Sequence, residues 1–190
     1  FDPYFYAPAS KNAVQEIYNN SVHCPFEMEV DPSVQTVLQL IRKQRASTPP
    51  QRLLIHYFGH GCHPPTDDGS IYFFSEDRAR YKPIKVTNLL NTSTSPICAI
   101  IDAPNAGSLY RYFSAKADTF AFFACSAGEA LPLSTDAPLD LFSSCLLTPY
   151  DTALWFHRRH HSCVHEMEGN AAENAKDYMK NVLDAILEAI

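Results

Sequence analysis

Two apolar runs of the sequence each end in residues that suit acid–base or nucleophilic chemistry. The run 53–58 leads to the base His60, and the run 97–101 leads to Asp102 and Ala103. Because the carboxyl ends of parallel strands meet at one edge of a sheet, we expect these residues to lie close together. A cysteine thiolate beside an imidazole would form a nucleophilic pair, but alanine supplies no thiol. The sequence therefore predicts a histidine kept at a catalytic position whose nucleophile is missing.

The elements that must position these residues follow a repeated β-α-β pattern, which predicts a doubly wound α/β sheet. The run 52–58 alternates too little for a half-exposed strand, so we expect helices on both of its faces. The expected strands are 26–30, 52–58, a hairpin arm at 70–75, 97–101 and 119–125. The expected helices are 11–19, one capped by Asp31 with Pro32 in its first position, 87–90, 105–116, 139–147, 150–161 and 171–190.

Length and composition bound the kind of protein. The 190 residues, 46% of them hydrophobic, suffice for one domain over 1–190, with a core at about 10–128 and a helical part at about 132–190. The net charge of −6 gives no basic surface for nucleic acid, and no apolar run is long enough to cross a membrane. Of the six cysteines, four lie in or beside apolar segments, where free buried thiols are common. We therefore expect a protein of a reducing compartment that binds neither nucleic acid nor the membrane interior.

An ordered series of motifs resembles the N-terminal caspase-like domain of the raptor family. The motif Asp140-Leu141-Phe142-Ser143-Ser144-Cys145-Leu146-Leu147-Thr148-Pro149 is the most diagnostic. The others are at 31–34, 56–61, 64–66, 69–72, 102–107 and 124–125. The separation of His60 and Ala103 is also close to the roughly 50 residues typical of a caspase His and Cys. The resemblance implies a caspase-like three-layer α-β-α sandwich with a mostly parallel sheet. The first strand of such a sheet would precede Ser10, and we expect it to be missing from this excerpt.

The resemblance also implies a function. Raptor is the scaffold subunit of TOR complex 1, and it presents substrates to the TOR kinase rather than cutting them. The implied partners are the TOR kinase, other subunits of the complex and substrate proteins with a TOR-signalling motif. The implied location is the cytoplasm, with recruitment to lysosomal or vacuolar membranes. The chain departs from the family at Ala103 and Pro104, where raptors usually have cysteine and serine after the aspartate.

The candidate site residues form two groups. His60 and Ala103 stand at the positions of a catalytic dyad, and the missing thiol predicts a pseudo-peptidase. Backbone N–H groups of Gly61 and Ala103 could still form the remnant of an oxyanion hole and hold an extended peptide. The possible peptide cleft comprises Gly61, Asp102, Asn105 and Cys125.

Other interpretations remain open at this stage. One is an active caspase-like cysteine peptidase, whose nucleophile is Cys125 or a cysteine that was replaced at position 103. Another is a structural domain with no occupied cleft. Histidines and cysteines cluster at 56–63 and at 157–165, but their spacings do not match a structural zinc site. We therefore expect neither a metal nor another cofactor.

Overall fold

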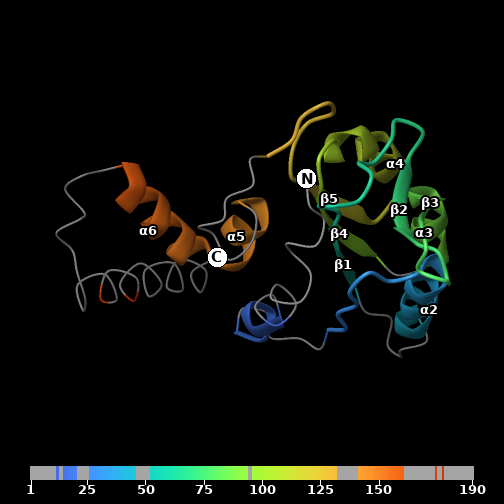
Figure 1. The fold of residues 1–190 in the computed structure, drawn as a ribbon, viewed down its shortest axis with the longest axis horizontal. Helices are drawn as coiled ribbons and strands as arrows, with labels where there is room; N and C mark the ends of the chain where they lie inside the picture. Colours follow the sequence, from blue (N-terminus) through green and yellow to red (C-terminus); the bar gives the residue numbers. More distant parts are fainter. Residues whose placement is uncertain are drawn as a thin grey trace. The chain divides into compact units, whose positions relative to one another are not determined.

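The computed structural model describes residues 12, 15–20, 26–45, 52–93, 96–131, 141–160, 174 and 177. They belong to two compact units. The first unit comprises residues 1–7 and 26–132 and contains the sheet (Figure 1). The second comprises residues 8–25 and 133–190. That residues 1–190 act as one domain stays a prediction.

The central sheet has three parallel strands in the order β1–β4–β5. These are β1 (Leu53–Phe58), β4 (Ile97–Asp102) and β5 (Thr119–Phe123). The register pairs Phe58 with Asp102, so the chain leaves β1 and β4 at the same edge of the sheet. The fold is the mixed α/β type with a mostly parallel sheet that the sequence predicted. The strands at 52–58 and 97–101 are confirmed, whereas the third ends earlier than expected, at Phe123.

A separate antiparallel hairpin lies beside the sheet. It consists of β2 (Ser70–Phe74) and β3 (Tyr81–Lys85), which confirms the hairpin predicted here (Figure 1). The Tyr57 hydroxyl of β1 donates a hydrogen bond to the Tyr72 carbonyl oxygen at 3.2 Å. The rings of Tyr57 and Phe73 also meet edge to face, with centroids 5.4 Å apart. The hairpin is thus fastened to the sheet by one buried tyrosine.

Helices of the first unit cover one face of the sheet. The core on this face includes Ile97, Ala99 and Ile101 of β4, each 2% exposed or less, packed with Leu109 and Phe113. Because alternate residues of a strand point to opposite faces, the residues between Ile97, Ala99 and Ile101 lie on the other face of the sheet. The covering helices are α2 (Val34–Arg45), α3 (Val86–Thr92), the 3-10 helix η2 (Ala106–Leu109) and α4 (Tyr110–Ser114). The predicted helix 105–116 is therefore η2 followed by α4.

The opposite face of the sheet carries large apolar side chains that remain partly exposed. Leu54 and Phe58 of β1 are 43% and 38% exposed, and Phe120 and Phe122 of β5 are 61% and 41% exposed. Helices of the first unit cover one face of this strand, and the covering of the face that carries Leu54 and Phe58 stays a prediction. The alternation of exposed and buried residues along β1 could not be seen in the sequence, because apolar residues occur on both faces of the strand.

The entry to α2 also differs from the prediction. Residues 26–30 are irregular rather than a strand. Asp31 has a left-handed backbone with φ of 49°, so it does not serve as the N-cap. Ser33 takes that role, since its Oγ accepts a hydrogen bond from the Thr36 N–H at 3.1 Å. The helix consequently begins at Val34, later than predicted.

The second unit contains α5 (Leu141–Leu147) and α6 (Pro149–His160), which confirm the helices predicted there. Hydroxyl groups of Thr148 and Thr152 both donate to the Ser144 carbonyl oxygen, at 3.1 and 3.0 Å. These bonds link the end of α5 to the first turns of α6. Residues 12 and 15–20 are helical, as expected for 11–19, and the predicted helix 171–190 lies outside the described residues except for 174 and 177. Within the described part of the chain, no helix has the length and apolar character to span a membrane.

Candidate functional site

The sheet brings together the two residues that the sequence singled out first. The Nε2 atom of His60 lies 2.8 Å from Oδ1 of Asp102. Asp102 is fully buried, and the His60 side chain is 16% exposed. The Gly59 N–H donates to the Asp102 carbonyl oxygen at 2.7 Å, which continues the pairing of β1 and β4 beyond Phe58. The carboxylate therefore fixes the orientation of the imidazole.

Position 103 lies in the core rather than on an accessible surface. Ala103 is 1% exposed and belongs to the buried apolar cluster. A Cβ added to Gly59 would lie 2.7 Å from the Cβ of Ala103 and 2.5 Å from Cε1 of Tyr57. Glycine is therefore needed at 59 to let the two strand ends approach, because the Ala103 side chain and the Tyr57 ring occupy the space that a Cβ there would take. The assignment of 103 as a dyad position stays a prediction from the sequence.

Tyr57 and Cys62 form a small, partly buried network that sequence reasoning did not identify. The Tyr57 hydroxyl lies 3.1 Å from the Cys62 Sγ, and that thiol donates to the Gly59 carbonyl oxygen at 3.2 Å. Burial raises the pKa of Cys62 and holds the pKa of Tyr57 well above its ordinary value. Cys62 is therefore a neutral thiol that holds the turn after β1. A tyrosine inside an apolar strand was the available signal, because a buried hydroxyl needs a partner.

Asn105 ties two loops together at the carboxyl edge of the sheet. Its Nδ2 donates to the Pro65 carbonyl oxygen at 2.6 Å, and its Oδ1 accepts from the Gly128 N–H at 2.7 Å. Its own N–H donates to the Glu129 carbonyl oxygen at 2.7 Å. The backbone at Asn105 is left-handed with φ of 59°, a conformation that asparagine tolerates. Of the predicted cleft residues, Asp102 and Asn105 thus use their side chains inside the protein, whereas Gly61 is exposed.

Among the described residues, Cys125, the alternative nucleophile, has no hydrogen bond to a histidine. Its Sγ donates to carbonyl oxygens of Ala103 at 3.4 Å and Glu129 at 3.1 Å. A cysteine nucleophile needs a neighbouring base, and the bonds of this thiol go to main-chain acceptors instead. The contacts therefore support a packing role for Cys125.

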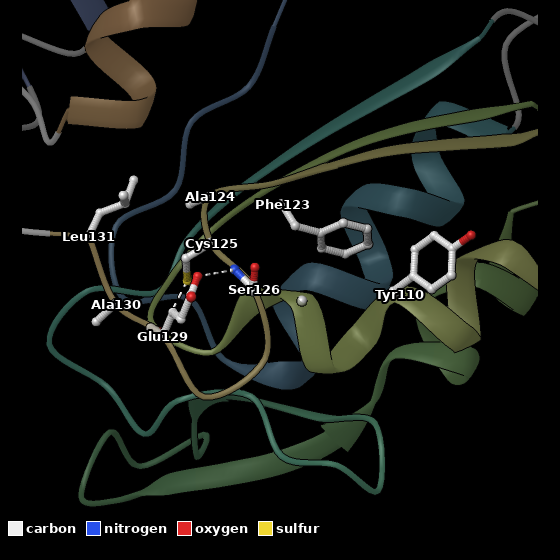
Figure 2. A pocket seen from close by; sticks show the side chains of 9 residues that line it. Tyr110, Phe123, Ala124, Cys125, Ser126, Glu129, Ala130 and Leu131 are labelled. Carbon is white, nitrogen blue, oxygen red and sulfur yellow. Dashed lines mark hydrogen bonds between the residues drawn. The ribbon is translucent and has the colours of Figure 1, made fainter.

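A depression of about 800 Å³ opens beside Cys125 at the carboxyl end of β5. Figure 2 shows the rings of Phe123 and Tyr110 on one side and the loop with Glu129 and Leu131 on the other. Tyr110 is 65% exposed. The Glu129 carboxylate accepts the Ser126 N–H at 3.2 Å, which holds the loop closed on itself. The lining comprises Gly107, Tyr110, Phe123, Ala124, Cys125, Ser126, Glu129, Ala130 and Leu131. Gly107, Ala124 and Cys125 lie in motifs that the sequence analysis named. The other lining residues could not be singled out from the sequence, because small and apolar side chains line much of any core.

The histidines near the sheet make ring contacts. The His56 ring stacks on Phe58 with centroids 4.0 Å apart, and the His63 ring lies 5.2 Å from that of Tyr72. Among the residues that the structure describes, no group of three His, Cys, Asp or Glu side chains could hold a metal ion. Residues 161–165 of the second histidine-rich stretch lie outside the described part.

The parallel sheet and the covering helices with His60 at a strand end define a caspase-like α/β domain. The same fold is found in the crystal structure of Chaetomium thermophilum Raptor, with a TM-score of 0.69 and 24% identity. That match covers 88% of this chain and 16% of the Raptor chain.

The chain belongs to the family of Raptor N-terminal CASPase like domains, whose family model matches residues 2–113. Regulatory-associated protein of TOR 2 from Oryza sativa subsp. japonica is 28% identical over 218 residues, covering 100% of this chain and 16% of that protein. Target of rapamycin complex 1 subunit mip1 from Schizosaccharomyces pombe is 28% identical over 187 residues, covering 82% of this chain and 14% of its own length. The raptor resemblance seen in the sequence is confirmed, and this chain spans a small part of each relative.

Proposed function

We propose that this chain is the caspase-like part of a raptor-type subunit of TOR complex 1 and that it cuts no peptide bond. On this proposal, it helps recruit substrates and present them to the TOR kinase. Two relatives are named as subunits of this complex and two others as regulatory-associated proteins of TOR, which supports the assignment. The proposed location is the cytoplasm, with recruitment to lysosomal or vacuolar membranes.

The geometry around His60 is the observation that supports the absence of peptide-bond cleavage. Its Nε2 atom is engaged by the buried Asp102 at 2.8 Å, and the next residue along the chain, Ala103, is buried and has no thiol. A cysteine peptidase needs a thiolate within reach of a base that takes up its proton. The Cys125 thiol instead donates to two carbonyl oxygens. The arrangement supports a structural role for the former catalytic edge.

The test is affinity purification of the full-length natural protein from its own cells, with mass spectrometry of the co-purifying proteins. We expect a TOR-family kinase in near-equal amount. Recovery of the intact protein without any TOR kinase would contradict the proposal. The same spectra read the residue at position 103, and a natural cysteine there without any co-purifying TOR kinase would favour the peptidase interpretation.

A further inference from the structure

In the described part of the chain, the outer edge of β5 offers backbone hydrogen-bonding groups that no other strand uses. The Ala124 N–H donates to Ile101 of β4, and the Ile97 N–H of β4 donates to Asp118. Because successive residues of a strand direct their N–H and C=O groups to opposite sides, those of Thr119, Ala121 and Phe123 point away from β4. Within the part of the chain that the structure describes, β5 is the last strand of its sheet, and no backbone bond joins these groups to another strand.

This edge lacks the features by which proteins protect exposed strands. The outer strand of the hairpin, β3, carries Pro83 and the charged residues Lys82 and Lys85. Proline cannot donate a hydrogen bond, and charges oppose pairing with another chain. β5 has the sequence Thr-Phe-Ala-Phe-Phe, without charge or proline. The β5 edge is therefore open to pairing with an incoming strand.

The depression beside Cys125 continues from this edge. Phe123 belongs to both, because its backbone groups point outward and its ring lines the depression (Figure 2). The Phe123 ring packs edge to face on Phe113, with centroids 5.5 Å apart, so its position is fixed by the core. Tyr110 and Leu131 provide further apolar walls. A strand paired with β5 would place a side chain at the mouth of this depression.

The charge at the depression selects among possible partners. Glu129 is the one charged residue in its described lining, and its side chain is exposed. A carboxylate at the rim of an apolar site favours a Lys or Arg on the partner. We propose that the outer edge of β5 binds an extended peptide of another protein, with a large apolar side chain in the depression and a basic residue beside Glu129. This proposal goes beyond membership of TOR complex 1 and does not depend on it.

The test uses purified full-length protein and a phage-displayed library of random nine-residue peptides. We expect enrichment of peptides with a large apolar residue next to Lys or Arg. Selection on a Glu129→Lys variant should favour acidic neighbours instead. Enrichment that is the same on both proteins, or no enrichment, would overturn the proposal.

Strand pairing is tested separately from side-chain preference. Methylation of single peptide amides should weaken binding at least about tenfold at every second position and little between them, because only alternate N–H groups face β5. An Ala121→Pro variant, which removes an outward N–H as Pro83 does in β3, should lose the peptides. The methylation profile is measured with the unchanged protein, so it does not depend on whether the Ala121→Pro variant folds. A methylation profile without alternation would overturn the proposal, and so would self-association of the protein through β5 that excludes the peptides.

Discussion

The two ends of the sheet's carboxyl edge differ in how their polar groups are used. At the His60–Asp102 centre, the ionisable side chains are bonded to each other and shielded from water. At the β5 edge, backbone groups and an aromatic-lined depression remain accessible. The residues that suggest chemistry by their type are thus engaged inside the protein, whereas the open surface is built from phenylalanine, alanine and leucine. The comparison indicates that the ionisable side chains at one end of this edge serve the packing of the sheet, while the other end leaves groups available for binding.

The largest expected effect is at the closed centre. Asp102→Ala should lower the free energy of unfolding by about 3–5 kcal/mol, because it removes the buried acceptor of His60 and leaves a cavity. Urea-induced unfolding of the 190-residue chain at neutral pH measures this change. If the centre were merely a relic without structural importance, the loss would stay under about 1 kcal/mol.

Asp102→Asn is the matched control for this substitution. The amide oxygen can still accept a hydrogen bond and fills nearly the same space, so the variant should keep most of the stability that Asp102→Ala loses. Equal losses in the two variants would show that the carboxylate charge, rather than the space it fills, is what the centre requires.

A pH effect is expected from His56 of β1, the strand that leads to His60. Burial lowers the pKa of His56 to about 4, although the charge of Asp102 acts in the opposite direction. The unfolded chain, with a His pKa near 6.5, therefore takes up a proton between about pH 6.5 and 4 that the folded chain does not. Stability should be complete above about pH 6.5 and fall by up to about 3 kcal/mol towards pH 4.

The measurement is the free energy of unfolding at several pH values, compared with His56→Gln. The glutamine variant cannot titrate, so its curve should be flatter in this window while other ionisable groups contribute equally to both. If the free energy of unfolding depended on pH in the same way in both proteins, His56 would be in contact with water. The accessible surface at the β5 edge would then have a counterpart in β1.

Ala103→Cys places a thiol next to Asp102, and its reactivity can be compared with that of Cys125 near the β5 edge. The added sulfur enters the packed space beside Gly59, so we expect a loss of about 1–3 kcal/mol in stability. A thiol-reactive probe should label the introduced cysteine more slowly than Cys125, which is less buried. Fast labelling at position 103, or cleavage of peptide substrates by the variant, would show that position 103 is accessible and that the centre is not closed.

Most of the strand framework could be predicted because apolar runs and their ends are local signals. The runs 53–58 and 97–101 identified the strands, and parallel pairing then required His60 to lie near Asp102. The faces of the sheet could not be predicted in the same way. Leu54 and Phe58 look like core residues in the sequence, and their exposure depends on what packs against them rather than on their type.

The contacts within the site could not be predicted from the sequence for a different reason. The N-cap was assigned to Asp31, and only the left-handed backbone there reveals that Ser33 takes the role. The bonds of Asn105 join residues about 40 and 23 positions away, a separation that no local pattern encodes. The depression at β5 likewise results from loop geometry rather than from a motif.

The smallest effect is expected at the open region. Glu129→Gln should change the free energy of unfolding by less than about 0.5 kcal/mol, because the side chain is exposed and an amide oxygen can still accept the Ser126 N–H. Affinity for a selected basic peptide should fall about twofold to fivefold at low salt and less at high salt, as for an exposed ion pair. Fluorescence titration at two salt concentrations measures this. Glu76→Gln is the control, since that carboxylate is engaged by Ser33 and Gln35 in the first unit and should leave peptide affinity unchanged. A stability loss at Glu129 as large as that at Asp102 would remove the distinction between a closed centre and an open edge.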